Sequence, residues 1–487
     1  MSYVGLFSSR TSLDMTADFA RTLASDPFDG CSLDEFGRRL RTGESSAEDV
    51  TRACLSRIEV LDPKLGAFEY VAAGAALAQA QAIDALLASG ADLGPLMGVP
   101  VAVKDLFAID GMPVTAGSRV PLDDAIGAEG PFVKALKRAG CVILGTTRTV
   151  ECAFGAAGIN SVRGTPWNPW DAGIHRLPGG SSSGSAVAVS AGLCAFAIGT
   201  DTGGSVRVPA ALCGIFGLKT TVGLWPTQGV FPLSTTLDSI GLLTRDADDA
   251  ATALAALTPD THVIWPAPPP ATLRLGRIRG YMDEQIDPNV HAAFETAVER
   301  LQSAGVTIED VPLPEAEERE RLIPAILGSE VLATVGRERF KTHRGDMDPV
   351  VAARIAAALD MRADEYIQAI RRHQALRDIM QARLQRVDGW ISPTCAVPPL
   401  PVADFADPED GTRLAGAVTR CSQPGNIFGL CGANVPLTEG QGLPVGFQLL
   451  CAPNTEAKAA AIGKTFQRIL GRRQIPPVET FLADSSP

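Results

Sequence analysis

The sequence lacks the features that mark membrane-bound, secreted and nucleic-acid-binding proteins. None of its apolar runs reaches the roughly 20 residues that a membrane-spanning helix requires. At the N-terminus no basic segment is followed by an apolar one, so no secretory signal is expected. Lysine and arginine (43) are outnumbered by acidic residues (55), and the formal net charge of −12 argues against a nucleic-acid footprint. We therefore expect a cytoplasmic protein that binds neither membrane nor nucleic acid.

The sequence also has little of the chemistry that metals and disulfides need. Its ten cysteines include no Cys-x-x-Cys pair and mostly stand in apolar surroundings, which indicates buried, reduced thiols. Only five histidines are present. Four of them follow the Ser-rich stretch described below and stand in loops or charged helical segments (His262, His291, His343 and His373). We expect no metal and no organic cofactor.

Composition and pattern predict an α/β protein. Apolar residues make up 46% and charged residues 20% of the 487 positions, which is enough for a large core. Length alone allows roughly two to three domains, but helical and strand-like segments alternate, as expected for a sheet covered by helices. Helices are expected over residues 11–23, 32–40, 72–87, 131–139 and 456–470, and after the capping box 45–48 as far as Asp62-Pro63. Strands are expected over residues 99–103, 141–144, 306–311 and 443–450.

One stretch, residues 178–219, has the composition of a site rather than of a linker. It reads PGGSSSGSAVAVSAGLCAFAIGTDTGGSVRVPAALCGIFGLK and contains two Gly/Ser clusters, 179–185 and 203–205. An almost uncharged apolar run, 186–198, separates them, whereas a flexible linker would not be joined to apolar segments on both sides. Glycine permits unusual dihedral angles and close approach of the backbone. We therefore expect two turns that meet over one pocket and present serines.

Three kinds of chemistry compete for these clusters. Residues 180–184 match the Gly-x-Ser-x-Gly nucleophile elbow, which requires a strand before it and a histidine base after it. No strand precedes these residues, and the later histidines stand in loops or charged helical segments. A phosphate-binding loop would end in Gly-Lys-Ser/Thr, which neither cluster contains. Serine–lysine variants of the catalytic triad exist, and Lys104 follows the apolar strand expected at 99–103. The pattern thus favours an acyl transferase or hydrolase whose base is a lysine.

The segments around the clusters resemble the amidase signature family. The resemblance rests on GGSSSGSA at 179–186, GTDTGGSVRVPAALCGIFGLKTT at 199–221 and GVPVAVKDLFAIDGMPVTAGS at 98–118. Further matching segments are GTPWNPWD (164–171), LDSIG (237–241), WISPTCAVPPLP (390–401) and LPVGFQLL (443–450). Since the resemblance covers most of the chain, it implies the family's fold, an α/β/α sandwich with a large mixed β-sheet core covered by helices.

This fold implies a single amidase domain over residues 1–487. Four parts are expected within it: an N-terminal helical arm (1–70), the signature core (71–270), a mostly helical cap or insertion (271–387) and a return to the core (388–487). The boundary near 270 follows a change in composition at PAPPP, residues 266–270.

The resemblance also assigns the family's Ser–cisSer–Lys triad residue by residue. Lys104 matches the lysine, Ser181 the bridging serine that follows a cis peptide bond, and Ser205 the nucleophile. The family's oxyanion hole corresponds to the backbone amides of residues 202–205 (Thr202, Gly203, Gly204 and Ser205), and Ser182 corresponds to a neighbouring serine that hydrogen-bonds within the network. Three residues are predicted to line the substrate pocket, namely Met112, Phe154 and Trp225. Asp201 and Arg207, which flank the nucleophile, are expected to pair with each other.

Elementary chemistry gives these assignments a reason. A lysine with an ordinary pKa near 10.4 is protonated at neutral pH and cannot act as a base. Burial at the end of an apolar strand disfavours the ammonium form and lowers that pKa. A neutral Lys104 could then accept a proton from Ser181 while Ser181 accepts one from Ser205, and Ser205 would attack an amide carbonyl.

We therefore expect an amidohydrolase that cleaves a carboxamide C–N bond through a Ser205 acyl-enzyme, on small aliphatic or aryl amides. One alternative is the glutamine-hydrolysing A-type subunit of a tRNA amidotransferase. Against it, loop 155–161 reads GAAGINS, whereas those subunits favour a Thr-Glu-Asn-Ser run. A carbamate or urea hydrolase and a catalytically silent binding protein on the same scaffold also stay open. The partner is expected to be a small-molecule amide, and the resemblance allows a homodimer.

Overall fold

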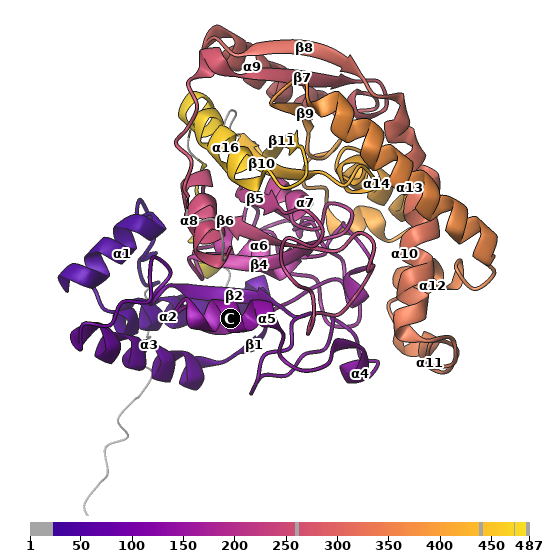
Figure 1. Ribbon diagram of the computed structural model, residues 1–487. Helices are drawn as coiled ribbons and strands as arrows, with labels where there is room; N and C mark the ends of the chain where they lie inside the picture. The colour runs from indigo at the N-terminus through magenta and orange to yellow at the C-terminus, as the bar shows by residue number, and fades with distance from the viewer. Residues whose placement is uncertain (1–22, 259–262, 438–441, 472, 484–487) are drawn as a thin grey trace, which may run out of the picture.

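A computed structural model describes residues 23–258, 263–437, 442–471 and 473–483 (Figure 1). An eleven-stranded mixed sheet runs through them in the order β1-β3-β2-β4-β6-β5-β10-β11-β9-β7-β8. Its strands are β1 (Phe68–Val71), β2 (Pro100–Lys104), β3 (Val142–Thr147), β4 (Phe196–Asp201), β5 (Phe216–Lys219), β6 (Ser239–Thr244), β7 (Arg274–Arg279), β8 (Thr307–Pro312), β9 (Gly389–Pro393), β10 (Cys431–Leu437) and β11 (Val445–Cys451). The predicted α/β class and large mixed sheet are confirmed.

Strand direction decides which loops meet. β2 pairs in parallel with β3 on one side and β4 on the other, so Val101 lies opposite both Ile143 and Phe196. A second parallel group, β9-β7-β8, forms one end of the sheet, and the pairs between the two groups are antiparallel. Because β2 and β4 run in the same direction, both finish at the same edge of the sheet.

Helices cover both faces of this sheet. They are α1 (Leu33–Thr42), α2 (Ala47–Leu65), α3 (Ala73–Ala88), α4 (Asp123–Ile126), α5 (Pro131–Arg138), α6 (Ser183–Ser190), α7 (Arg207–Leu212), α8 (Ala247–Leu257), α9 (Pro288–Ser303), α10 (Arg319–Val335), α11 (Arg337–His343), α12 (Pro349–Ala356), α13 (Ala363–Leu384), α14 (Pro408–Thr419), α15 (Gln423–Ile427), α16 (Glu456–Leu470) and α17 (Thr480–Ala483). Successive residues of a strand point to opposite faces. In β5 the Phe216 ring lies against Gly463 of α16, whereas Gly217 lies against Ala210 of α7. The sheet is therefore the middle of three layers.

Most elements expected from the sequence are present, with two corrections and one that is not described. Helix α2 continues through Pro63 and ends at Leu65, because Gly66 supplies the left-handed residue (φ 57°) that closes it. Within 271–387, β8 matches the strand expected at 306–311, but β7 is a second strand that was not expected, and both extend the main sheet. The helix predicted over 11–23 lies outside the described residues except for its last position.

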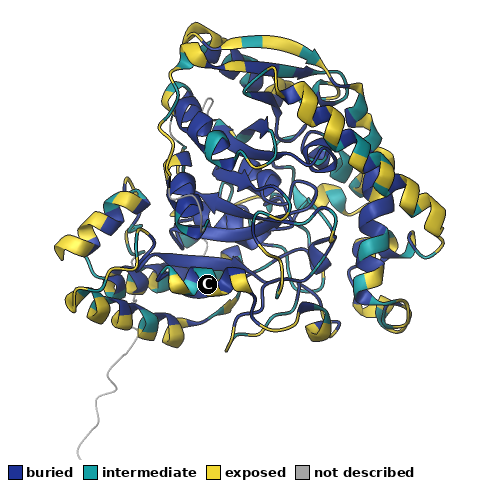
Figure 2. Ribbon diagram, in the orientation of Figure 1, coloured by how far each residue is buried: buried dark blue, intermediate teal, exposed yellow. Residues whose placement is uncertain are grey.

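The core extends along the whole sheet. Figure 2 shows the central strands buried, with exposed residues on the outer sides of the surrounding helices, for example α1–α3 and α13, and on the edge strand β8. All ten cysteines are free and buried, as the sequence predicted. Among the described residues, no helix combines the length and apolar character needed to cross a bilayer.

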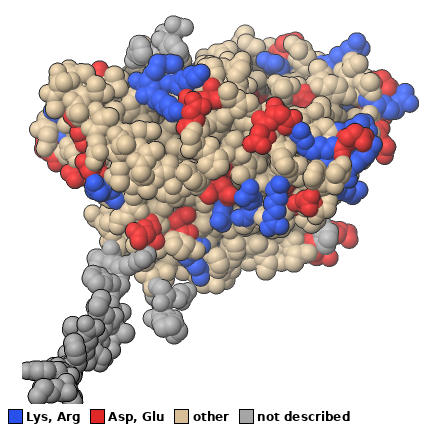
Figure 3. Space-filling view, turned by 90° about the horizontal axis from the view of Figure 1, so that it is seen from below, with Lys and Arg blue, Asp and Glu red and all other residues tan. Residues whose placement is uncertain are grey.

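Charged side chains occupy the remaining surface. On the face shown in Figure 3, Lys and Arg side chains stand interspersed with Asp and Glu. Surface ion pairs such as Arg38–Glu44 (2.7 Å) accompany this mixing. Exposed pairs of this kind contribute little to stability, roughly 0–1 kcal/mol each. The fold is therefore held by the buried sheet rather than by its surface charges.

Candidate active site

The strand ends bring the two Gly/Ser clusters and the lysine together. β2 ends at Lys104 and β4 ends at Asp201, and the two strands are parallel neighbours. The turn 202–205 follows β4 directly, while the cluster 179–182 leads into α6, which packs on β2 and β4. Residues from three separate segments thus meet at one edge of the sheet, which is where open α/β sheets commonly bind ligands.

Lys104 and Ser181 are in direct contact. The Nζ atom of Lys104 lies 2.7 Å from the Oγ of Ser181 and 2.8 Å from the Oγ1 of Thr200, and Lys104 is fully buried. The Gly180–Ser181 peptide bond is cis, as the sequence predicted. The carbonyl oxygen of Ser181 accepts a hydrogen bond from the Thr149 hydroxyl at 2.9 Å. Backbone and side chain of Ser181 are therefore both held in place.

The Lys104 amine is poised to exchange a proton near neutral pH. Burial lowers the pKa of Lys104 from its ordinary range to about 7, and the carboxylates of Asp238 and Asp201 offset part of this effect. A desolvated ammonium ion is costly in an apolar environment, which favours the neutral amine. The expectation of a lowered lysine pKa is confirmed in direction.

Ser205 is joined to the first cluster through its backbone and lines a cavity. Its side chain is nearly buried, and the residue lines the cavity described below. The carbonyl oxygen of Ser205 accepts a hydrogen bond from the backbone N–H of Ser182 (3.3 Å). The Ser182 hydroxyl donates to the carbonyl oxygen of Thr200 and accepts from the Thr200 N–H, both at 3.3 Å. Ser182 therefore connects the first cluster to β4 and to the second cluster.

The four backbone amides predicted to face a substrate are not equivalent. The N–H of Gly204 donates to Asp201 Oδ1 at 2.8 Å, which corrects the expectation that this amide is free. Among the described residues, the N–H groups of Thr202, Gly203 and Ser205 have no protein acceptor. Gly204 adopts φ +114°, and an added Cβ would lie 2.3 Å from the Ser422 hydroxyl, so only glycine fits the turn.

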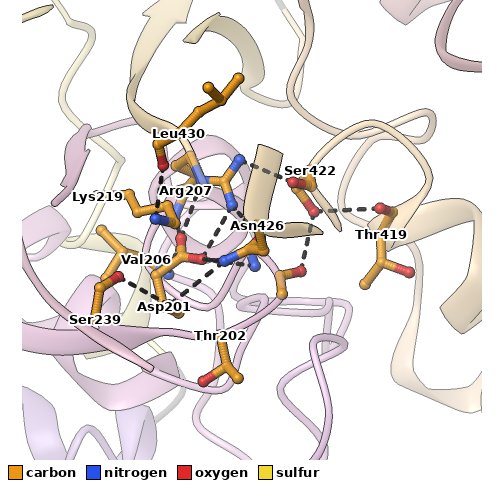
Figure 4. Close-up of polar contacts among 12 residues, drawn as sticks. Asp201, Thr202, Val206, Arg207, Lys219, Ser239, Thr419, Ser422, Asn426 and Leu430 are labelled. Carbon is orange, nitrogen blue, oxygen red and sulfur yellow. Dashed lines mark hydrogen bonds and ion pairs between the residues drawn. The ribbon is translucent and has the colours of Figure 1, made fainter. Parts of the chain in front are cut away.

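A buried ion pair holds this turn from behind (Figure 4). Asp201 and Arg207 are fully buried, with Oδ1 and Nη2 3.0 Å apart, as expected from the sequence. Asp201 also accepts from the side-chain amide of Asn426 (2.8 Å), and Arg207 donates to the carbonyl oxygen of Ser422 (2.9 Å). Although burial would raise it, the pKa of Asp201 lies below its ordinary range because of Arg207. The pair fixes residues 201–207 against α15.

Asp238, which the motif LDSIG contains, supports the turn from another side. Its Oδ1 accepts a hydrogen bond from the Thr202 hydroxyl at 2.7 Å, and its Oδ2 accepts one from the Ser234 N–H at 3.0 Å. Burial raises the pKa of Asp238 to about 7. The resemblance implies a structural role for Asp238, whereas Thr200 was assigned no role from the sequence although it stands in a segment that carries the resemblance.

A cavity of about 350 Å³ opens beside Ser205. Its floor includes Thr202, Gly203 and Ser205. Its remaining walls come from Phe154 and neighbouring loop residues and from α10, α12 and α14, and they are mainly apolar. Within the part of the chain that the structure describes, no group of three His, Cys, Asp or Glu side chains is arranged to hold a metal ion.

The substrate-pocket predictions fare differently. Phe154 lines the cavity, but Met112 and Trp225 do not. Trp225 is buried against Phe132, with ring centroids 5.0 Å apart, and its indole N–H donates to the carbonyl oxygen of Leu257 at 3.1 Å. Met112 is partly buried against the main core. Both side chains pack against the core, so the lining of this cavity gives those two assignments no support.

Comparison with known proteins agrees with this site. A family model described as Amidase matches residues 49–459. The chain belongs to the amidase family. The 2-amino-5-chloromuconic acid deaminase of Comamonas testosteroni is 39% identical over 450 residues, covering 91% of this chain and 96% of the relative. The A-type subunit of the glutamyl-tRNA(Gln) amidotransferase of Symbiobacterium thermophilum is 32% identical over 486 residues, covering 92% and 99%. A solved amidase crystal structure superimposes with a TM-score of 0.83 at 29% identity, covering 90% of this chain and all of that chain.

Membership of this family makes the chain a hydrolase that acts on amide C–N bonds. The matched region contains every residue that lines the cavity, and it begins two residues into α2 and ends in α16. The amidohydrolase expected from the sequence is confirmed at this level.

Proposed function

We propose that the chain hydrolyses a small carboxamide through an acyl-enzyme on Ser205, with Lys104 and Ser181 as a proton relay. The observation that carries the proposal is the 2.7 Å contact between Lys104 Nζ and Ser181 Oγ, buried behind a serine that opens onto a cavity. A nucleophile needs an adjacent base that is neutral at working pH, and the lowered pKa of Lys104 meets that need.

The proposed reaction moves one proton out and back. The neutral Lys104 amine accepts a proton from Ser181 as Ser181 accepts one from Ser205, and the Ser205 oxygen bonds to the amide carbonyl carbon. The C–N bond then breaks as the proton returns along the same relay to the leaving nitrogen, because an unprotonated amine is a poor leaving group. Water repeats the sequence on the acyl ester and releases the acid and free Ser205.

Developing negative charge on the carbonyl oxygen would be bound by backbone amides. The free N–H groups of Thr202, Gly203 and Ser205 are the candidates. Donors of this kind are commonly worth roughly 3–4 kcal/mol each. Gly204 has a different part in the proposal, since its hydrogen bond to Asp201 fixes the turn that presents the other three.

The cavity favours a small acyl group. Its volume of about 350 Å³ lies near the lower end of the range for small-molecule sites, and apolar side chains make up most of its walls. We propose small aliphatic or aryl amides as substrates, with carbamates or ureas as alternatives on the same relay. The sequence also predicts that the protein is located in the cytoplasm and allows it to form a homodimer.

A second candidate is glutamine hydrolysis as the A-type subunit of a tRNA amidotransferase. It is favoured by the 32% identity that extends over 99% of one such subunit. Loop 155–161 argues against it, because it reads GAAGINS and contributes Gly155 and Ala156 to the cavity wall. The two candidates differ in whether the lone chain turns over amides other than glutamine.

The test is release of amine from a panel of small amides, anilides, carbamates and glutamine. The wild-type chain is compared with Ser205→Ala and Lys104→Ala, and with Ser183→Ala as a matched control. Ser183 is a buried serine of the same cluster whose hydroxyl donates to the Arg148 carbonyl oxygen instead of facing the lysine. We expect both test variants to lose turnover and the control to keep it. Full activity of Ser205→Ala would refute the acyl-enzyme, and turnover of glutamine alone would favour the amidotransferase candidate.

A further inference from the structure

Residues 232–238 form a loop before β6 that connects the cavity wall to the turn after β4. Leu233 lines the cavity. The N–H of Ser234 donates to the carboxylate of Asp238 at 3.0 Å, and the other oxygen of that carboxylate accepts from the Thr202 hydroxyl at 2.7 Å. The 232–238 loop therefore contacts both the cavity and the first residue of the turn that presents the free backbone amides.

Helix α10 holds this loop at two points that lie one helical turn apart. The Thr334 hydroxyl donates to the carbonyl oxygen of Pro232 at 3.0 Å. Glu330 accepts hydrogen bonds from the hydroxyls of Ser234 and Thr236, and also from the backbone N–H of Thr236 at 3.2 Å. Residues four positions apart lie on the same face of a helix, so one face of α10 is directed at the loop.

The Glu330 carboxylate uses its full capacity as an acceptor. In addition to the three donors of the loop, it accepts from the Tyr366 hydroxyl of α13 at 2.7 Å. Burial and the hydrogen bond to Glu330 raise the pKa of Tyr366 to about 12, so the phenol keeps its proton. An ionised carboxylate can accept about four hydrogen bonds, and such bonds are stronger than those between neutral groups. The loop is therefore firmly attached to α10 and α13 at this point.

We propose that Glu330 is a positioning residue for the turn 202–205, which it fixes through the 232–238 loop and the contact of Asp238 with Thr202. This inference rests on the proposed function, in which the free amides of the turn bind the developing negative charge. Such donors are effective because they are already aligned and need not reorient as the charge develops.

Helix α10 also forms part of the cavity wall, through residues such as Ile323 and Leu327. Glu330 itself does not line the cavity, so its effect on the reaction must pass through the loop. Loss of its hydrogen bonds should leave the wall in place while the amides of the turn lose their fixed direction. Because an interaction made only in the transition state acts on kcat, we expect kcat to fall while KM stays the same.

The test measures steady-state kinetics of Glu330→Gln and Thr202→Val, singly and combined, on the best amide of the panel. An amide side chain has one acceptor oxygen in place of two, so Glu330→Gln should lower kcat about tenfold, as should loss of the Thr202 hydroxyl. Because both changes break the same chain of contacts, the double variant should be about as slow as the slower single one. A loss that multiplies to about 100-fold would overturn the inference, because independent sites behave in that way.

Two further variants separate positioning from general loss of structure. Glu318→Gln is the matched control, because Glu318 accepts from Arg372 of α13 (2.8 Å) and contacts neither the 232–238 loop nor the cavity. It should keep the kcat of wild type. Thr236→Val removes one donor to Glu330 without touching Asp238 and should lower kcat by a smaller factor than Glu330→Gln. If Thr236→Val behaved like wild type, or Glu318→Gln like Glu330→Gln, the inference would be wrong.

Hydrogen exchange followed by mass spectrometry provides a readout that needs no turnover. The peptide 202–208 contains protected amides, since Gly204 donates to Asp201 (2.8 Å) and Val208 to the Gly204 carbonyl oxygen (2.7 Å). Its exchange should be faster in Glu330→Gln than in wild type, whereas β11 should exchange as before. If no amide of the panel is hydrolysed, the proposed function fails while this measurement still decides the inference. Equal exchange of the peptide in both proteins would contradict it.

Discussion

Lys104 at the end of β2 and Lys219 at the end of β5 are both fully buried. Burial lowers the pKa of both amines, to about 7 for Lys104 and to about 8 for Lys219. The oxygen atoms around them differ. Lys104 contacts the hydroxyls of Ser181 and Thr200, whereas Lys219 donates to the carbonyl oxygens of Thr220 and Leu430, each at 2.8 Å.

The difference teaches that burial alone does not make a lysine a base. A hydroxyl carries a proton that a neutral amine can accept, whereas a carbonyl oxygen carries none. Lys219 can therefore only donate, and its two hydrogen bonds join the end of β5 to the residue before β10 (Figure 4). We expect Lys104 to govern turnover and Lys219 to govern stability.

The largest effect is expected for Lys104→Met. This change keeps the length of the side chain but removes the base, so kcat/KM should fall at least about 1,000-fold, as when the base of a serine triad is removed. Steady-state kinetics on the best amide of the panel measures it, and circular dichroism checks that the variant is folded. A folded variant with more than a tenth of wild-type activity would contradict the proposed relay.

Lys219→Met should have the opposite profile. Two buried carbonyl oxygens lose their donor, which we expect to lower the free energy of unfolding by roughly 2–4 kcal/mol. Urea denaturation monitored by fluorescence measures the loss. Activity per folded molecule should stay within about tenfold of wild type, since no proton is exchanged at this site. If Lys219→Met kept its stability but lost turnover, Lys219 would have a catalytic role like that proposed for Lys104, which would contradict the prediction.

The pH dependence sharpens the comparison further. Because the base must be neutral, kcat/KM should fall about tenfold per pH unit below the pKa of Lys104, which lies at about 7, and level off above it. Asp238, whose pKa is also raised to about 7, titrates in the same range. The inflection should persist in Asp238→Asn and in Lys219→Met. If the inflection disappeared in Lys219→Met, the titrating group would be Lys219 rather than Lys104, and the prediction would be wrong.

The smallest effect is expected for Thr200→Val, which removes one of the two hydroxyls around Lys104. We expect a loss of about tenfold in kcat/KM, the worth of one buried hydrogen bond. Thr146→Val is the matched control, because the Thr146 hydroxyl on β3 is buried and has no partner among the described residues. The control should keep full activity. Equal losses in both variants would mean that Thr200 acts only through packing.

Much of the site could be predicted from local sequence. The apolar strand before Lys104 and the glycines around Ser181 and Ser205 are contiguous signals, because strands and turns depend mainly on neighbouring residues. β7 and β10 were not predicted. The first, RLGRIR, contains three arginines, so its apolar residues do not stand out as a strand pattern. Its arginines pair with acidic neighbours such as Glu295. The second, CGANVPL, contains poor strand formers, and the side chain of Asn434 bonds to Ile215 and Thr394, which are distant in the chain.

The backbone amide of Gly204 shows where local reasoning stopped. The resemblance implied that the amides of residues 202–205 face a substrate, but the Asp201 carboxylate accepts the Gly204 N–H. That geometry depends on Arg207, Asn426 and Ser422, and two of these stand more than 200 positions away in the chain. Long-range hydrogen bonds of Asn426 and Ser422 with the local Asp201–Arg207 ion pair thus help to decide which amides can face a substrate.

By itself the sequence determined the sheet class, the family and the positions of the lysine and serines of the proposed relay, because each depends on short segments whose order is readable. Only the tertiary structure decided which of two buried lysines faces hydroxyls and which amides are free. The reason is physical. Those properties depend on the partners that distant segments bring within about 3 Å, and hydrogen bonds at that range are set by packing rather than by neighbours in the chain.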